Sequence, residues 1–152
     1  HRVDRRQRQM CIRDRWSALY LALRVQGKEL TTERTQKAVR QWYRDRAEDV
    51  FQRRLTMMVE ALPWAKTIPD WRMIEMQTQW GSCSPEGAVL LNPHLIKANT
   101  RAIDYVLLHE LCHLLEHNHS PRFYALLDRF MPEWRSVKER LDGQAEQLLL
   151  GA

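Results

Sequence analysis

The longest regular pattern in the 152-residue chain predicts a helix from Thr31 or Thr32 to about Leu62. Apolar residues recur there at intervals of three and four, as on a helix with one buried face. Pro63 predicts the end of the helix, because proline lacks the N–H that would continue it. The residues expected on the buried face are Ala38, Val39, Trp42, Tyr43, Ala47, Val50, Phe51, Leu55, Met58 and Val59.

The pattern then changes to the alternation of a strand, from Arg72 to Trp80. Residues 81–87 are rich in Gly, Ser and Pro and indicate a turn, and Ala88–Asn92 fits a second strand. These segments predict an antiparallel hairpin with a seven-residue connection. Pro93–Lys97 is expected to form a short helical turn.

Three further helices follow in the predicted order. The first begins after Asn99 or Thr100 and runs to about His117, the second covers Pro121–Met131, and the third runs from Pro132 to about Leu141. The predicted fold class is therefore α+β, mostly helical with a small antiparallel hairpin. We expect a single domain at residues 31–143 and a tail at 144–152. Before them we expect a poorly packed arm with a short apolar segment at 1–30, in which Trp16–Val25 fits either a strand or a helix.

Composition bears on the binding partners and the cellular compartment of the protein. The net charge of +5 comes largely from the first fifty residues, and acidic residues are interspersed with the basic ones. A solvated surface explains this pattern more simply than a nucleic-acid site. The three cysteines form no C-x-x-C pair, which indicates a reducing compartment. No run approaches 20 apolar residues, so we expect no membrane helix and a cytoplasmic protein.

The candidate chemistry lies at residues 109–113, which read His-Glu-Leu-Cys-His. Positions i and i+4 share one face of a helix, so His109 and His113 can point two imidazoles at one ion. Glu110 directly follows the first histidine and is placed to polarise a metal-bound water. The helix around the motif is apolar on almost every side, where His and Glu are costly without a partner. A zinc ion would supply that partner, which predicts a zinc hydrolase.

A third ligand has to come from chain that leaves the helix and turns back. On a continuing helix, His117 would lie about 12 Å along the axis from His109, too far to share one ion. We predict that Asn118 makes a left-handed turn, that Ser120 and Pro121 open the next helix, and that His119 points back at the metal. The less favoured alternatives for the third ligand are His117, Glu116 and Asp128.

The chain also resembles the YgjP-like metallopeptidase domain, a group related to the WLM and SprT-like zinc proteases. The resemblance implies a zincin-like catalytic domain with zinc ligands at His109, His113 and His119 and a catalytic Glu110. Gln77 and Gln79 replace basic residues common in the group, His94 replaces an Arg, Tyr124 replaces a Trp, and the group's β-rich N-terminal portion is shortened or missing. The residues that carry the resemblance are Gln79–Ser84, Gly87, Leu91, Asn92, Ile103–Val106, the motif at 109–113, Asn118–Ser120, Phe123, Pro132 and Trp134.

The predicted reaction is hydrolysis of peptide bonds in a peptide or protein substrate by a zinc-activated water, with Glu110 as general base. The oxyanion would need a second donor. An extended peptide could add to the edge of the strand that ends at Trp80. Candidate oxyanion donors are Tyr124, Arg122 and the backbone at Gly81 and Ser82, although each of these residues also has a simpler structural role.

Two other functions stay open at this point. The first is a metal-dependent nucleotide pyrophosphatase or phosphohydrolase, which the resemblance allows. The sequence has neither a Gly-rich phosphate loop nor a carboxylate cluster for Mg²⁺, and this counts against that function. The second is a nucleic-acid-binding module in which zinc is structural, and such a site is normally closed by a fourth protein ligand.

Overall fold

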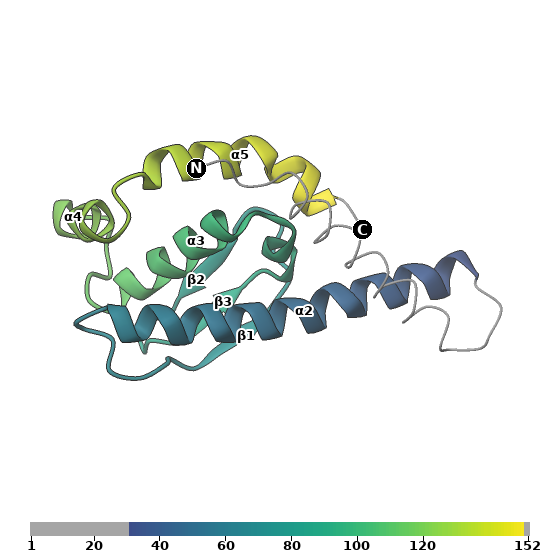
Figure 1. Ribbon diagram of the computed structural model, residues 1–152, viewed down its shortest axis with the longest axis horizontal. Helices are drawn as coiled ribbons and strands as arrows, with labels where there is room; N and C mark the ends of the chain where they lie inside the picture. Colours follow the sequence, from purple (N-terminus) through teal and green to yellow (C-terminus); the bar gives the residue numbers. More distant parts are fainter. Residues whose placement is uncertain (1–30, 151–152) are drawn as a thin grey trace, which may run out of the picture. The chain divides into compact units, whose positions relative to one another are not determined.

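The computed structural model describes residues 31–150, so the predicted arm and the apolar segment Trp16–Val25 lie outside the described residues. The chain divides into two compact units between Trp42 and Tyr43. The described part of the first unit is the start of helix α2 (Thr32–Ala61). The second unit contains the rest of α2, a small sheet and the remaining helices (Figure 1).

Helix α2 confirms the first prediction from the hydrophobic pattern. It begins at Thr32 and ends at Ala61, two residues before Pro63. Its buried residues are spaced by three, one, four and four positions, which places them along one face. These residues are Ala47, Val50, Phe51, Leu55 and Val59.

An ion pair joins α2 to the helix that carries the candidate motif, α3 (Thr100–His113). The Nε of Arg54 donates to Oδ1 of Asp104 at 2.7 Å, and Nη2 donates to Oδ2 at 2.6 Å. The Asp104 side chain is only 6% exposed and that of Arg54 is 24% exposed. The hydrogen bond to Asp104 raises the pKa of Arg54, so the guanidinium stays charged. Two parallel bonds to one carboxylate fix the direction as well as the distance between the helices.

We expect Asp104→Asn to lower the free energy of unfolding by about 3 kcal/mol, because it leaves the Arg54 charge partly buried without its partner. This expected loss of stability is at the lower end of the range for buried ion pairs, because about a quarter of the Arg54 side chain is exposed. Urea unfolding followed by circular dichroism measures it. The control is Asp49→Asn, which breaks the exposed Arg53–Asp49 pair on α2 and is expected to cost less than about 1 kcal/mol. Equal losses in the two variants would contradict the prediction.

The sheet differs from the predicted hairpin. It has three strands, β1 (Trp71–Met73), β2 (Gly81–Cys83) and β3 (Val89–Leu91), in the order β1-β3-β2. Strand β1 is parallel to β3, whereas β2 is antiparallel to it. The predicted pairing of residues 72–80 with 88–92 as a hairpin is therefore wrong. The hairpin partner of β3 is β2, which lies inside the segment predicted to be a turn.

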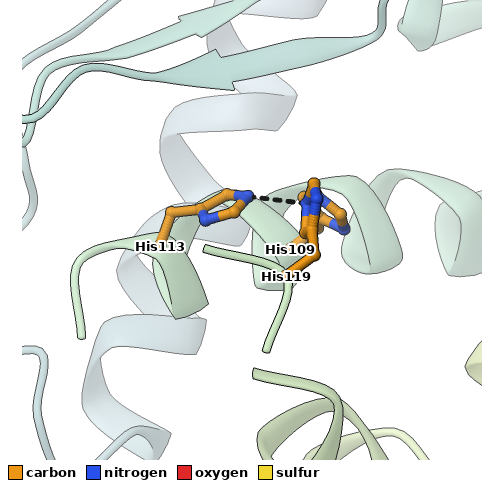
Figure 2. A group of neighbouring side chains, drawn as sticks. All are labelled: His109, His113 and His119. Atoms are coloured by element: carbon orange, nitrogen blue, oxygen red, sulfur yellow. Dashed lines mark hydrogen bonds between the residues drawn. The ribbon is translucent and has the colours of Figure 1, made fainter. Parts of the chain in front are cut away.

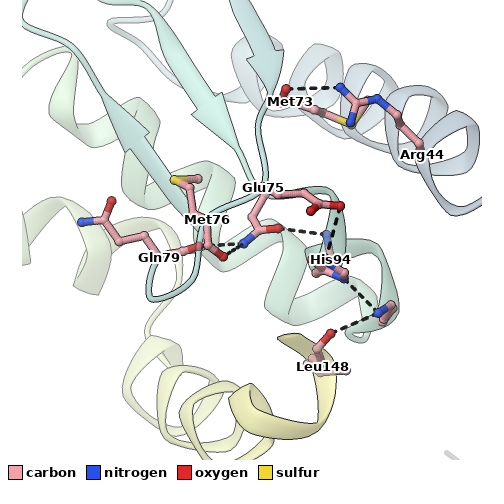
Figure 3. A network of polar contacts seen from close by, with 9 residues as sticks. Arg44, Met73, Glu75, Met76, Gln79, His94 and Leu148 are labelled. Carbon is pink, nitrogen blue, oxygen red and sulfur yellow. Dashed lines mark hydrogen bonds and ion pairs between the residues drawn. The ribbon is translucent and has the colours of Figure 1, made fainter. Parts of the chain in front are cut away.

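Local hydrogen bonds explain both errors. The turn needs only four residues, since the backbone N–H of Gly87 donates to Ser84 O at 2.9 Å and Gly87 has a φ of +90°. Residues 74–80 form no strand, because the buried side-chain amide of Asn92 donates to the carbonyl oxygens of Met76 and Gln79 at 2.8 and 3.0 Å (Figure 3). A side chain thus satisfies carbonyls that a neighbouring strand would otherwise have bound.

The connection from the sheet to α3 follows the sequence prediction. Residues Pro93–Lys97 form the 3₁₀ helix η1. Asn92 caps η1, because its side-chain oxygen accepts a hydrogen bond from the backbone N–H of His94 at 3.1 Å. Asn99 caps α3 by accepting from the backbone N–H of Ala102 at 2.8 Å. Helix α3 ends at His113, one turn before the predicted end near His117. Most of its residues are buried, as the apolar pattern predicted.

Two helices complete the unit, α4 (Pro121–Phe130) and α5 (Trp134–Leu150). Ser120 caps α4 with Pro121 at its start, as predicted. Helix α5 continues through Gly143, so its predicted end near Leu141 is wrong. A single Gly costs a helix only about 1 kcal/mol, and the ammonium of Lys97 donates to Leu148 O at 3.1 Å, which ties the end of α5 to η1 (Figure 3).

The structure confirms the predicted fold class, α+β and mostly helical, although the small sheet is mixed and not purely antiparallel. Across residues 31–150, no helix has the length and apolar character that a membrane span requires.

Candidate metal centre

Helix α3 places two histidines on one face, as the four-residue spacing predicted. The rings of His109 and His113 lie 5.0 Å apart at an interplanar angle of 73°. Both rings rest on Phe123 of α4, whose fully buried ring lies 4.9 Å from His109 and 4.6 Å from His113. Packing from α4 therefore fixes the orientation of side chains that belong to α3.

The chain reverses directly after α3. The indole N–H of Trp64 donates to Leu111 O at 2.9 Å and so binds a carbonyl at the end of the helix. The reversal closes with a bond from Ser120 N to Asn118 O at 2.8 Å. The predicted left-handed residue at Asn118 is wrong, because no residue other than Gly has a positive φ between residues 31 and 150. The reversal places His119 opposite the two helical histidines.

The three imidazoles converge on one point, as Figure 2 shows. The Nε2 atom of His119 lies 3.1 Å from Nε2 of His109 and 3.1 Å from Nε2 of His113. A tetrahedral zinc ion with Zn–N bonds of about 2.0–2.1 Å separates two ligand nitrogens by about 3.4 Å. The spacing of the three nitrogens therefore fits a shared metal ion. Within the described chain these three residues form the group able to hold one.

The surroundings of His109 and His113 favour the neutral imidazole, the form that binds a metal. Burial, with a smaller contribution from the neighbouring His113 and His119, lowers the pKa of His109 to about 3. Burial also lowers the pKa of His113. The Nδ1 atom of His113 lies 3.1 Å from Glu116 O, an acceptor that favours a proton on Nδ1 and leaves the Nε2 lone pair for a cation.

The alternative third ligands do not join the cluster. His117 is exposed and lines the adjacent cleft, but it is not part of the three-histidine group. Glu116 contacts His113 through its backbone carbonyl. The Asp128 carboxylate instead accepts hydrogen bonds from the side chains of Trp134 and Arg135 at 2.8 and 2.7 Å.

Glu110 is buried between α3 and strand β2. It is 5% exposed, and burial raises the pKa of its carboxyl to about 8. A divalent cation at the adjacent histidines would favour its charged form. A Cβ atom at Gly81 would lie 2.8 Å from Oε1 of Glu110, so a side chain there would force this carboxyl to move. Gly81 therefore serves the candidate site and not the turn to which the sequence pattern assigned it.

A cleft of about 560 Å³ opens over the histidines and Glu110. One wall is the segment leading into β2 together with the strand itself, from Thr78 to Cys83, and the opposite wall is α5. The α5 residues are Lys138, Leu141 and Asp142, and the ammonium of Lys138 lies 2.6 Å from the Asp142 carboxylate.

The predicted oxyanion donors separate into two groups. Gly81 and Ser82 line the cleft, whereas Arg122 and Tyr124 are not among its lining residues. Tyr124 is 38% exposed and stacks on Trp134 with ring centroids 5.6 Å apart.

Among the cleft residues that sequence reasoning missed are Tyr105, Lys138 and Asp142. Tyr105 precedes His109 by four positions, so helical periodicity alone could have placed it on the same face. Lys138 and Asp142 reach the cleft only because α5 packs against α3, and no local pattern records that packing.

A three-histidine cluster beside a buried carboxyl, in an open cleft of a mostly helical α+β unit, defines the class of a metal-dependent hydrolase. A family model described as YgjP-like, metallopeptidase domain, matches residues 10–144, so the chain belongs to this family. The protein is accordingly a metallohydrolase of a metallopeptidase family, which uses a divalent metal ion.

Two solved structures share the fold. The crystal structure of the metallopeptidase zymogen of Pyrococcus abyssi abylysin matches with a TM-score of 0.53 and 19% identity, covering 66% of this chain and 95% of that one. The metallopeptidase zymogen of Methanocaldococcus jannaschii jannalysin matches with a TM-score of 0.50 and 17% identity, covering 64% and 95%. No curated protein matches the sequence significantly. At these identities the likeness concerns the fold alone.

Proposed function

We propose that this metallopeptidase uses zinc, held by His109, His113 and His119, and hydrolyses peptide bonds with Glu110 as general base. The observation that carries the proposal is that Nε2 of His119 lies 3.1 Å from Nε2 of both helical histidines, beside a buried carboxyl. Bound zinc would lower the pKa of a water from about 15.7 towards 7 and polarise the substrate carbonyl. Glu110 accepts the proton of the attacking water and delivers it to the leaving nitrogen.

The backbone of β2 supports a peptide as substrate. Asn92 N donates to Trp80 O, and Ser84 N donates to Ala88 O, both at 2.8 Å. Since bonded residues alternate along an antiparallel pair, Gly81 and Cys83 direct their N–H and C=O groups away from β3. Strand β2 is the outer strand on this side, so these groups can bind an extended peptide along the cleft.

The rival functions have less support. A structural zinc site is usually closed by four protein ligands, whereas the group found in residues 31–150 contains three. A phosphohydrolase would need cationic groups or a carboxylate–Mg²⁺ cluster for the phosphates. The lysine of the cleft, Lys138, is already paired with Asp142.

Metal removal tests the proposal on a single purified sample. We expect dialysis against a chelator to abolish cleavage of a mixed peptide library, and one equivalent of zinc to restore it. Mass spectrometry of the library detects cleavage, and release of phosphate or pyrophosphate from nucleoside triphosphates is measured in parallel. Zinc-restored hydrolysis of nucleotides without peptide cleavage would replace the proposal with the phosphohydrolase. Bound zinc without either activity would favour a structural site.

A further inference from the structure

Tyr105 lies in the candidate site without a role in the mechanism described so far. It belongs to α3, one helical turn before His109, and the two rings lie 6.0 Å apart at 73°. Its side chain lines the cleft together with Glu110 and Gly81. The residue is 6% exposed, so it meets solvent only where it faces this cleft.

The hydroxyl group of Tyr105 lacks a partner in the described part of the chain. The indole N–H groups of Trp64 and Trp134 each donate a hydrogen bond, at 2.9 and 2.8 Å. Tyr105 forms none with any residue from 31 to 150. The Tyr105 oxygen is not one of the buried polar atoms left without a partner in residues 31–150, so it is accessible to solvent on the cleft side of the residue. A hydroxyl left unpaired at a cleft wall is available to a bound molecule.

The ring of Tyr105 is held in place by its neighbours. It stacks on Trp134 with centroids 6.2 Å apart and planes 7° apart, and Tyr124 stacks on Trp134 in turn at 5.6 Å and 20°. The Trp134 indole is fixed by its bond to Asp128. Burial raises the pKa of Tyr105 above its ordinary value, so the hydroxyl stays protonated and can donate. A fixed donor costs little reorganisation when charge develops beside it.

We propose that the Tyr105 hydroxyl donates a hydrogen bond to the oxygen of the substrate carbonyl under attack, a role that rests on the proposed peptidase function. The other side-chain candidates are placed less well. Lys138 is paired with Asp142, and Arg122 and Tyr124 are not among the residues that line the cleft. Tyr105 comes from the same rigid helix as Glu110, so donor and base keep a fixed separation.

The test is Tyr105→Phe, with Tyr124→Phe as the matched control on the same aromatic stack. We expect Tyr105→Phe to lower kcat for peptide hydrolysis about 100-fold with KM little changed, as for loss of one oxyanion donor. Zinc content and the thermal midpoint should match the wild type, because the hydroxyl binds no described residue. Tyr124→Phe should retain nearly full kcat. Unchanged kcat in Tyr105→Phe, or a change confined to KM, would overturn the proposal.

A second experiment measures the binding of a transition-state analogue and does not depend on catalytic turnover. A phosphinic peptide, whose tetrahedral phosphorus resembles the transition state, is titrated calorimetrically into the zinc-loaded wild type and both variants. We expect Tyr105→Phe to weaken the binding of this analogue by about the same factor as kcat. A peptide product of the cleavage, which has no tetrahedral centre, should bind equally well to the wild type and to the variant. If the wild type cleaves peptides but the wild type and both variants bind the analogue equally tightly, the proposed role of Tyr105 is wrong and the peptidase proposal stands. If the wild type neither cleaves peptides nor binds the analogue, the peptidase proposal fails with it.

Discussion

Glu110→Gln is expected to lower kcat for peptide hydrolysis on the order of 1,000-fold while leaving the metal bound. Gln has nearly the shape of Glu, so it fits the space that Gly81 leaves at the cleft wall. Its amide cannot accept a proton from water, which removes the general base and nothing else. The histidine cluster keeps its three nitrogens, so zinc content after dialysis should equal that of the wild type.

The matched control is Glu116→Gln. Glu116 lies close to the cluster, but its contact with His113 is made by the backbone carbonyl, which the substitution preserves. We expect its kcat to remain within about threefold of the wild type. Peptide cleavage and zinc content are measured on all three proteins. Retained hydrolysis in Glu110→Gln would mean that another group removes the proton, and joint loss of zinc and activity would mean that Glu110 supports the metal.

The parts of the site that the sequence predicted correctly depend on short-range geometry. The i, i+4 spacing of His109 and His113 fixes their common face on any helix, and the apolar residues around them predicted a buried helix. His119 was predicted because a straight helix carries His117 away from the ion and because Ser120 and Pro121 open a new helix directly after it. The structure groups His119 with the helical pair, and the three residues' role as ligands stays a prediction.

The errors arose where a residue has a long-range partner. Gly81 and Ser82 have turn propensities, yet they form β2, because β3 pairs with them. The Glu110 carboxyl occupies the space beside Gly81 that a side chain would fill. Residues 74–80 alternate like a strand, yet Asn92 takes their carbonyls. Trp64, distant in sequence, binds a carbonyl at the end of α3. None of these partners can be deduced from a local pattern.

The composition of the cleft could be predicted only in part for the same reason. Helical periodicity could have identified Tyr105, since it precedes His109 by one turn. Lys138 and Leu141 lie within the predicted helix, but their place at the cleft follows from the packing of α5 against α3, which no local pattern predicts. Asp142 lies beyond the predicted end, because Gly143 does not stop the helix and a single glycine costs it only about 1 kcal/mol.

His119→Ala is expected to weaken zinc binding by more than about 100-fold. Loss of a group that merely orients a ligand typically costs 10–100-fold, and this change removes a ligand nitrogen itself. His117→Ala is the matched control, because His117 lines the same cleft two residues earlier but lies outside the cluster. We expect it to bind zinc as the wild type does. Competition with a chromophoric chelator gives both affinities.

Because His119 is exposed, the zinc affinities of the two variants can be compared without a difference in folding. Both His117 and His119 are exposed, so neither substitution opens a cavity in the core, and circular dichroism should show equal folding of both metal-free variants. A difference in zinc affinity between the two variants then reflects the loss of a metal ligand and not a change in the stability of the fold. If His117→Ala loses zinc while His119→Ala keeps it, the third ligand is His117. The reversal after α3 would then have to rearrange when the metal binds, because in this structure the nitrogen 3.1 Å from both helical imidazoles belongs to His119.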